Sequence, residues 1–278
     1  MTRWFITGIS RGFGQALAQA ALARGDLVVG TTRDGKSSIA ATHGTLHVLP
    51  LEISDAAAID STVAKAFELA GGGLDVIVNN AAYGLLGAIE NASDAEAARL
   101  FEVNVFGTFR VIRAALPQLR AQRRGHIINI TSIAGRAPMA GSGLYAATKS
   151  AIEGLSQSLA QEVGPLGIKV TAVAPGAFRT DFLSPHSIRK SAPAGDAYID
   201  SVGRTVTRLD AIAGQQPGDP SRAAQALLAV ADAEQPPLHL LLGSDALRRA
   251  REKLDVLIDE MDRWEAVTRG TDFPPASR

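Results

Sequence analysis

The chain has 278 residues, 46% of them apolar and 20% charged, which excludes extensive disorder and rod-like folds and favours one α/β domain. Lys plus Arg number 28 and so do Asp plus Glu, so the sequence lacks the basic excess of proteins that bind nucleic acids or anionic membranes. Cysteine is absent, which excludes disulfide frameworks and thiolate metal sites and is typical of a reducing cytoplasm. No apolar run approaches the ~18 residues of a membrane span, and the N-terminal apolar stretch is too short for a signal peptide.

Short Val- and Ile-rich runs alternate along the chain with longer Ala- and Leu-rich stretches. The short runs predict seven strands, at residues 4–7, 27–31, 46–50, 75–78, 126–130, 168–173 and 238–242. The longer stretches predict helices at residues 13–23, 54–69, 145–163, 220–231 and 244–267, and two consecutive helices between residues 94 and 122. Nearly continuous apolar strands separated by helices indicate an α/β Rossmann fold, a doubly wound parallel sheet with helices on both faces. No linker or repeat divides the chain, so we expect a single domain over residues 1–278.

A glycine-rich turn, Thr7-Gly8-Ile9-Ser10-Arg11-Gly12-Phe13-Gly14, lies between the first predicted strand and the first predicted helix. Glycine lets the backbone turn tightly and approach a pyrophosphate, which the amides of the helix N-terminus attract. The motif alone is weak evidence, because glycine also ends ordinary loops. The flanking strand and helix supply the context that a dinucleotide site needs, so we predict dinucleotide binding here.

Tyr145 and Lys149 are four residues apart and share one face of a predicted helix. Such a pair usually lies on a helix surface, but two further polar residues accompany this one. Ser132 ends the fifth strand, and Asn104 lies in an apolar helical stretch where it needs a partner. The strand ends and the glycine loop should meet at the carboxyl edge of the sheet, where doubly wound folds bind ligands.

Together, these motifs resemble those of the short-chain dehydrogenase/reductase family, in its compact single-domain branch, over nearly the whole chain. The ordered set is Thr7-Gly8-x3-Gly12-x-Gly14, Asn79-Asn80-Ala81, Asn104, Ser132, Tyr145-x3-Lys149 and Pro175-Gly176. Residues 79–90 and 238–242 look most similar to a subgroup like the 17β-hydroxysteroid dehydrogenases. Ala82 departs from the family, which usually has Gly there; because Ala is the smallest change, we expect cofactor binding to survive.

The resemblance implies an oxidoreductase that moves a hydride between NADP(H) and a carbonyl or secondary alcohol of a small apolar substrate. Tyr145 is the expected acid/base, and Lys149, together with the positive nicotinamide of the oxidised cofactor, should favour its phenolate and lower its pKa. Ser132 should hydrogen-bond the reacting oxygen, and Asn104 should hold a water that relays protons to Lys149. The implied cofactor contacts are Gly8, Ser10, Arg11, Gly12, Phe13, Gly14, Arg33, Glu52, Ile53, Asn80, Ala81, Ala82, Tyr145, Lys149, Pro175, Gly176, Phe178 and Thr180.

The residues after the second predicted strand favour NADP(H) over NAD(H). NAD-selective sites place an acid there to hold the ribose hydroxyls, whereas this chain has Thr32 followed by Arg33. Arg11 is a second candidate for the 2′-phosphate, and Lys36 is a third. Asp34 is the nearest acid, and we expect it to face solvent.

Several expectations concern the remainder of the chain. Residues 184–216 lack clear periodicity and should form an irregular substrate lid with some helix. The stretches at residues 106–119 and 151–163 are apolar around much of their circumference, and by resemblance they form the interface of a homodimer or homotetramer. The five histidines show no paired metal-ligand spacing and fit strand ends or the surface, so no metal is expected. An apolar substrate wall is one interpretation of a set that fits ordinary packing equally well: Leu85, Leu86, Leu144, Phe178, Phe182 and Leu183.

Two other functions compete with a reductase. A dinucleotide-sensing regulatory protein would bind cofactor without turnover, but such proteins commonly lack the tyrosine or the lysine. A sugar-nucleotide epimerase or dehydratase of the extended branch would carry Gly-x-x-Gly-x-x-Gly and a larger C-terminal portion, and this chain has neither. The complete Asn-Ser-Tyr-Lys set therefore favours the reductase.

Overall fold

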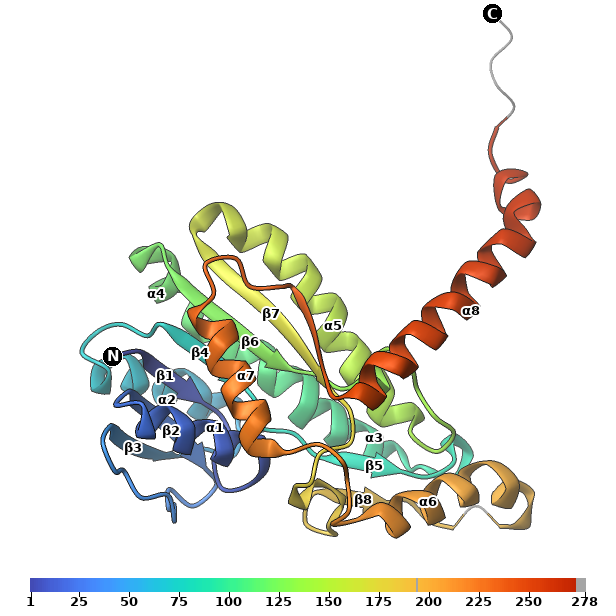
Figure 1. Ribbon diagram of the computed structural model, residues 1–278, viewed down its shortest axis with the longest axis horizontal. Helices are drawn as coiled ribbons and strands as arrows, with labels where there is room; N and C mark the ends of the chain where they lie inside the picture. The colour runs from blue at the N-terminus through green and yellow to red at the C-terminus, as the bar shows by residue number, and fades with distance from the viewer. Residues whose placement is uncertain (194, 274–278) are drawn as a thin grey trace, which may run out of the picture.

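The computed structural model describes residues 1–193 and 195–273, and a parallel sheet forms its centre (Figure 1). The strands run in the order β3-β2-β1-β4-β6-β7-β9, all parallel. Their bounds are β1 (Arg3–Ile6), β2 (Leu27–Thr32), β3 (Thr45–Pro50), β4 (Val76–Asn79), β6 (Gly125–Ile130), β7 (Ile168–Pro175) and β9 (His239–Leu242). The seven predicted strands and the predicted fold class are confirmed.

Helices cover both faces of the sheet because successive side chains along a strand point to opposite faces. Trp4 and Ile6 of β1 pack on one side with α1 (Gly12–Ala23) and α7 (Pro220–Asp232). Phe5, between them, packs on the other side with α2 (Ala56–Leu69), α4 (Thr108–Gln122) and α5 (Gly143–Val163). Burial of each large apolar side chain contributes about 1.5–3 kcal/mol, so these two layers hold the strand ends in fixed positions.

The stretch between residues 94 and 122 forms the two consecutive helices that were expected, with no loop between them. α3 (Asp94–Phe101) passes through a π-helical turn, Glu102–Gly107, directly into α4. The turn places Asn104 where its side chain bonds both backbone groups of Tyr83. Gly107 packs so close to Ile53 that an added Cβ would lie 2.7 Å from Cγ1 of Ile53. Such π-helical turns occur often at functional sites.

A second, two-stranded parallel sheet lies beside the main one, at the carboxyl ends of its strands. It pairs β5 (Gly84–Leu86) with β8 (Ile188–Lys190), and α6 (Arg204–Ile212) follows in the same segment (Figure 1). Neither three-residue strand was predicted, because a run this short carries no readable periodicity. The expected lid is therefore more regular than its sequence indicates.

The C-terminal helix α8 (Ser244–Arg269) projects away from the rest of the chain (Figure 1). Its buried residues, Ala246 and Ala250, lie near its start. Leu254, Met261 and Trp264 are 57%, 62% and 63% exposed, so solvent surrounds the apolar face of this helix as well as the charged face that was expected. No helix in the described part of the chain combines the length and the apolar character needed to cross a membrane.

Candidate active site

A cavity of about 370 Å³ opens at the carboxyl edge of the sheet. It lies beside the point where the strand order reverses between β1 and β4, which is where doubly wound sheets bind ligands. Ser132, Tyr145 and Lys149 line it together. The predicted cofactor contacts that also line it are Gly8, Ser10, Arg11, Gly12, Phe13, Arg33, Glu52, Ile53, Asn80, Ala81, Ala82, Pro175, Gly176, Phe178 and Thr180. Of the predicted cofactor contacts Gly14 lies outside the lining, and of the predicted catalytic residues Asn104 does.

The glycine loop has the backbone that its sequence predicts. Gly8 and Gly12 have φ angles of +74° and +60°, a region that other residues rarely adopt. Gly14 lets the first turn of α1 pack directly against the loop, because a Cβ at Gly14 would lie 2.3 Å from the Gly8 carbonyl oxygen. Asn80 fixes the same turn by donating from Nδ2 to the carbonyls of Thr7 and Gly8, both at 2.9 Å. The loop is therefore a preformed cradle, closed to a side chain at Gly14 and held by positive φ angles at Gly8 and Gly12.

Two cations border the part of the cavity next to β2. Arg11 and Arg33 both line it, and neither forms an ion pair within the described residues. Asp34 is exposed, as expected, and accepts hydrogen bonds from Thr32 and from the Lys36 backbone N–H, which lowers the pKa of its carboxyl. Lys36 lies outside the lining. This corner therefore fits an additional anionic group.

Tyr145 and Lys149 come from the start of α5, and Ser132 follows β6. The Lys149 Nζ atom lies 5.8 Å from the centre of the Tyr145 ring and donates to the Ile130 carbonyl at 2.8 Å. The Ser132 hydroxyl accepts from the Ala134 N–H at 3.1 Å, which orients it. Phe182, from the short helical turn Asp181–Leu183 just before the lid segment, packs against the Tyr145 ring with 5.8 Å between the ring centres. The three polar groups therefore converge in a largely apolar surrounding.

Burial dominates the proton equilibria of this pair. It raises the pKa of Tyr145 to about 12, and the hydrogen bond with Ser132 acts in the opposite direction. It lowers the pKa of Lys149 to about 8, while the Glu153 carboxylate one helical turn later raises it. In the protein alone the Tyr145 pKa is raised, because desolvation of the phenol outweighs the hydrogen bond with Ser132. The lowering expected from Lys149 together with the positive nicotinamide of the oxidised cofactor stays a prediction for the cofactor complex.

Asn104 lies behind the cavity wall. Its Oδ1 accepts from the Tyr83 N–H at 3.0 Å, and its Nδ2 donates to the Tyr83 carbonyl at 2.9 Å and to the Thr148 hydroxyl at 3.2 Å. These bonds tie the loop after β4 to the helix turn that carries Tyr145 and Lys149. The visible contribution of Asn104 is thus to hold two walls of the cavity together.

The far side of the cavity is largely apolar. Four residues of the expected apolar substrate wall line it: Leu86, Phe178, Phe182 and Leu183. The other two, Leu85 and Leu144, pack behind it, as the alternative of ordinary packing had it. Sequence reasoning missed several lining residues because they belong to no local motif: Tyr83, Met139, Ser142, His186, Arg189, Leu209, Ile212, Gln216 and Arg249. Leu209, Ile212 and Gln216 come from the expected lid, and Arg249 comes from α8.

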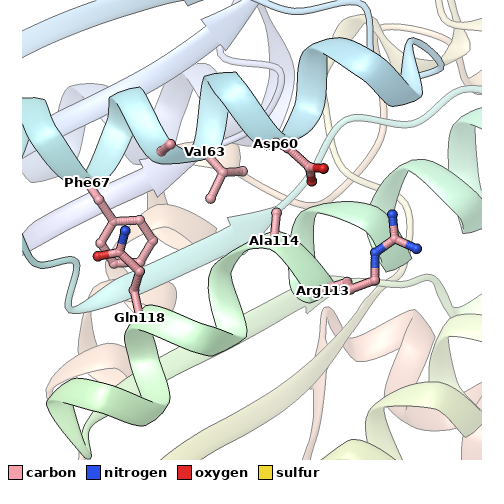
Figure 2. Close-up of a pocket in the computed structure, with 7 residues that line it drawn as sticks. Asp60, Val63, Phe67, Arg113, Ala114 and Gln118 are labelled. Atoms are coloured by element: carbon pink, nitrogen blue, oxygen red, sulfur yellow. The ribbon is translucent and has the colours of Figure 1, made fainter.

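A second hollow, of about 300 Å³, lies between α2 and α4 (Figure 2). Asp60 and Arg113 flank one end of it, and Phe67 and Gln118 flank the other. None of the predicted site residues line it. Within the residues that the structure describes, no group of three or more His, Asp or Glu side chains is placed to hold a metal ion. His126, expected at a strand end or the surface, is a buried residue of β6 whose ring bonds the Thr171 hydroxyl at 2.9 Å.

Known proteins share both the sequence and the fold. The short chain dehydrogenase family profile matches residues 3–190. Oxidoreductase BOA17 of Botryotinia fuckeliana is 35% identical over 269 residues, which cover 95% of this chain and 97% of that protein. A 3-ketodihydrosphingosine reductase of Bacteroides thetaiotaomicron is 36% identical over 205 residues, or 74% of each chain.

Solved structures agree with these sequence matches. The crystal structure of a short-chain dehydrogenase from Streptomyces avermitilis superposes with a TM-score of 0.90 at 41% identity, covering 98% of this chain and 100% of that one. A metagenomic short-chain oxidoreductase solved in complex with NADP has a TM-score of 0.67 at 29% identity, covering 87% and 96%. The chain is therefore a member of the short-chain dehydrogenase/reductase family of oxidoreductases.

Proposed function

We propose that this protein is an NADP(H)-dependent reductase of ketones or aldehydes, acting in reverse on secondary or primary alcohols. The observation that carries the proposal is the convergence of Ser132, Tyr145 and Lys149 on a cavity whose other end is a preformed glycine cradle. The cradle fits a dinucleotide, because the turn presents its N–H groups at the start of α1, where a pyrophosphate binds. Gly14 keeps this turn closely packed, since a Cβ there would strike the Gly8 carbonyl.

In the proposed reaction, bound NADPH supplies the hydride to the carbonyl carbon. The Tyr145 hydroxyl donates its proton to the carbonyl oxygen, so that the product is a neutral alcohol. The Ser132 hydroxyl hydrogen-bonds the same oxygen and stabilises its developing negative charge. The Lys149 ammonium lies beside the Tyr145 ring and stabilises the phenolate that proton transfer leaves behind.

Preference for NADP(H) rests on the two cations beside β2. A charge-assisted hydrogen bond contributes roughly 1.5–3 kcal/mol, so Arg11 and Arg33 can each supply about ten- to hundred-fold selectivity for a phosphorylated ribose. Arg33→Ala should weaken NADPH binding by that factor and leave NADH binding nearly unchanged. Lys36→Ala is the matched control, because Lys36 is exposed and outside the lining. Equal losses for NADPH and NADH, or a wild-type preference for NADH, would refute the selectivity.

Turnover is tested by mixing purified protein with NADPH and a panel of ketones, aldehydes and quinones and following the cofactor absorbance. The proposal expects cofactor oxidation with at least one carbonyl class. Tight NADPH binding without turnover on any class would instead support a cofactor-sensing regulatory protein.

We further propose that the chain acts as one domain and assembles into a homodimer or homotetramer through α4 and α5. Exposed aromatic side chains at and just before the start of α4 support this, since Phe106 and Phe109 are 46% and 40% exposed. Light scattering at micromolar concentration should give two or four times the mass of the chain, and Phe109→Glu should lower it. A monomeric wild-type protein contradicts the assembly.

A further inference from the structure

Arg249 is an unusual residue in the cavity because it reaches the apolar half from the C-terminal helix. It lines the cavity with Met139, Leu183, Leu209 and Ile212, on the side of the loop that follows Ser132. Its guanidinium donates to the carbonyl of Ala137, which belongs to that loop. A lining of this composition accommodates an apolar body with one cation at its boundary.

No acid of the described residues forms an ion pair with this guanidinium, although the side chain is only partly exposed. Asp245 is the nearest acid on the same helix face, but its Oδ2 accepts the Ala177 N–H at 2.9 Å and so holds the loop after β7. Partial burial is the largest cause that lowers the pKa of Arg249; Arg208 of α6 and Arg248 lower it further, whereas the charges of Asp245 and Glu252 raise it without forming an ion pair with it.

A partly desolvated guanidinium with one carbonyl partner retains several free donors and a strong attraction for an anion. Its planar fork matches a carboxylate, which it binds through two parallel hydrogen bonds. A neutral ligand in the same cavity would leave these donors without a charged acceptor. The side chain therefore discriminates between ligands by charge as well as by shape.

We propose that Arg249 is a specificity-determining residue and that the preferred substrates are oxo acids, in which an apolar body separates the reacting carbonyl from a carboxylate. This inference rests on the proposed reductase function and adds the substrate class. The carboxylate binds the Arg249 guanidinium while the apolar body occupies the space between that residue and Tyr145.

Steady-state kinetics with NADPH test the substrate class, using medium-chain oxo acids and their methyl esters as matched pairs. The wild-type protein should favour each best acid over its ester by about 10- to 100-fold in kcat/KM. Arg249→Met, which keeps an unbranched side chain and removes its charge, should abolish that preference by slowing the acid alone. Arg249→Lys should retain part of it. Arg248→Met is the control, because Arg248 is exposed and pairs with Glu252, and its preference should match the wild type.

Calorimetry supplies a readout that needs no turnover. Saturated medium-chain carboxylates should bind the NADPH complex more tightly than their methyl esters, and Arg249→Met should remove the difference. If ketones are reduced but the acids hold no advantage, or if Arg249→Met slows acid and ester equally, the substrate class is wrong and the reductase stands. If carboxylates bind through Arg249 while no carbonyl is reduced, the anion site stands and the reductase is wrong.

Discussion

Replacing Lys149 by Met should stabilise the fold while it removes activity. Lys149 is 4% exposed, and burial lowers its pKa from the ordinary 10.5 to about 8. That difference corresponds to about 3 kcal/mol, because each tenfold change in a proton equilibrium is about 1.4 kcal/mol. Methionine keeps an unbranched apolar side chain without the charge, but leaves the Ile130 carbonyl without its 2.8 Å partner at a cost of about 1 kcal/mol. The expected net gain at pH 7 is about 2 kcal/mol.

The pH dependence fixes the sign of this prediction. Between pH 8 and 10.5 the unfolded chain holds the Lys149 proton more tightly than the folded chain, so wild-type stability rises with pH across that window. The Met variant lacks this contribution, so its advantage in the free energy of unfolding should disappear near pH 9.5. By about pH 10.5 the variant should be about 1 kcal/mol less stable than the wild type, because the Ile130 carbonyl still lacks its partner. Urea unfolding followed by circular dichroism at pH 7 and pH 10 measures it. Lys65→Met, at an exposed position, should change stability by less than about 0.5 kcal/mol. A Met variant that is no more stable than wild type at pH 7, or whose gain is independent of pH, would refute the reasoning.

Two further predictions concern stability in acid and the glycine cradle. Burial lowers the pKa of His126 to about 4, so wild-type stability should fall by about 3 kcal/mol between pH 6.5 and pH 4 as the unfolded chain takes up this proton. His126→Gln should flatten that part of the urea-midpoint profile, and an unchanged slope would count against the assignment. Gly14→Ala should weaken NADPH binding or lower the melting temperature, since its Cβ would lie 2.3 Å from the Gly8 oxygen and crowding of this kind costs about 1–3 kcal/mol. Gly164→Ala, at the end of α5, meets nothing within 4 Å and has helical backbone angles, so it should lower neither NADPH binding nor the melting temperature. Equal losses from the two substitutions would contradict the cradle.

Structural features that depend on residues close together in the chain could be predicted from the sequence. The seven strands and the helices between them follow from hydrophobic periodicity, and the glycine loop follows from its place between β1 and α1. Both depend on residues close together in the chain. The short strands β5 and β8 are far apart in the sequence and become strands only by pairing with each other. No pattern within either three-residue segment indicates that pairing.

The same distinction separates the two halves of the cavity. Its cofactor side is built from strand ends, and each of these carries a short motif that can be recognised in the sequence by itself. Its apolar side gathers Met139, Ile212 of the lid segment and Arg249 of α8, which come from elements far apart in sequence. The environment of Tyr145 was also beyond the sequence, because the spacing to Lys149 predicts the attraction between the two groups but carries no information about desolvation.

The central claim is that Tyr145 transfers the proton in an NADPH-dependent carbonyl reduction. The most direct measurement is the single-turnover rate of Tyr145→Phe with saturating NADPH and the best carbonyl substrate, together with the NADPH dissociation constant of the same variant. Phenylalanine removes only the hydroxyl, so the rate should fall by about 10²–10⁴-fold while the dissociation constant changes by less than about threefold. A Tyr145→Phe variant that reduces the substrate at a near-normal rate would contradict the claim.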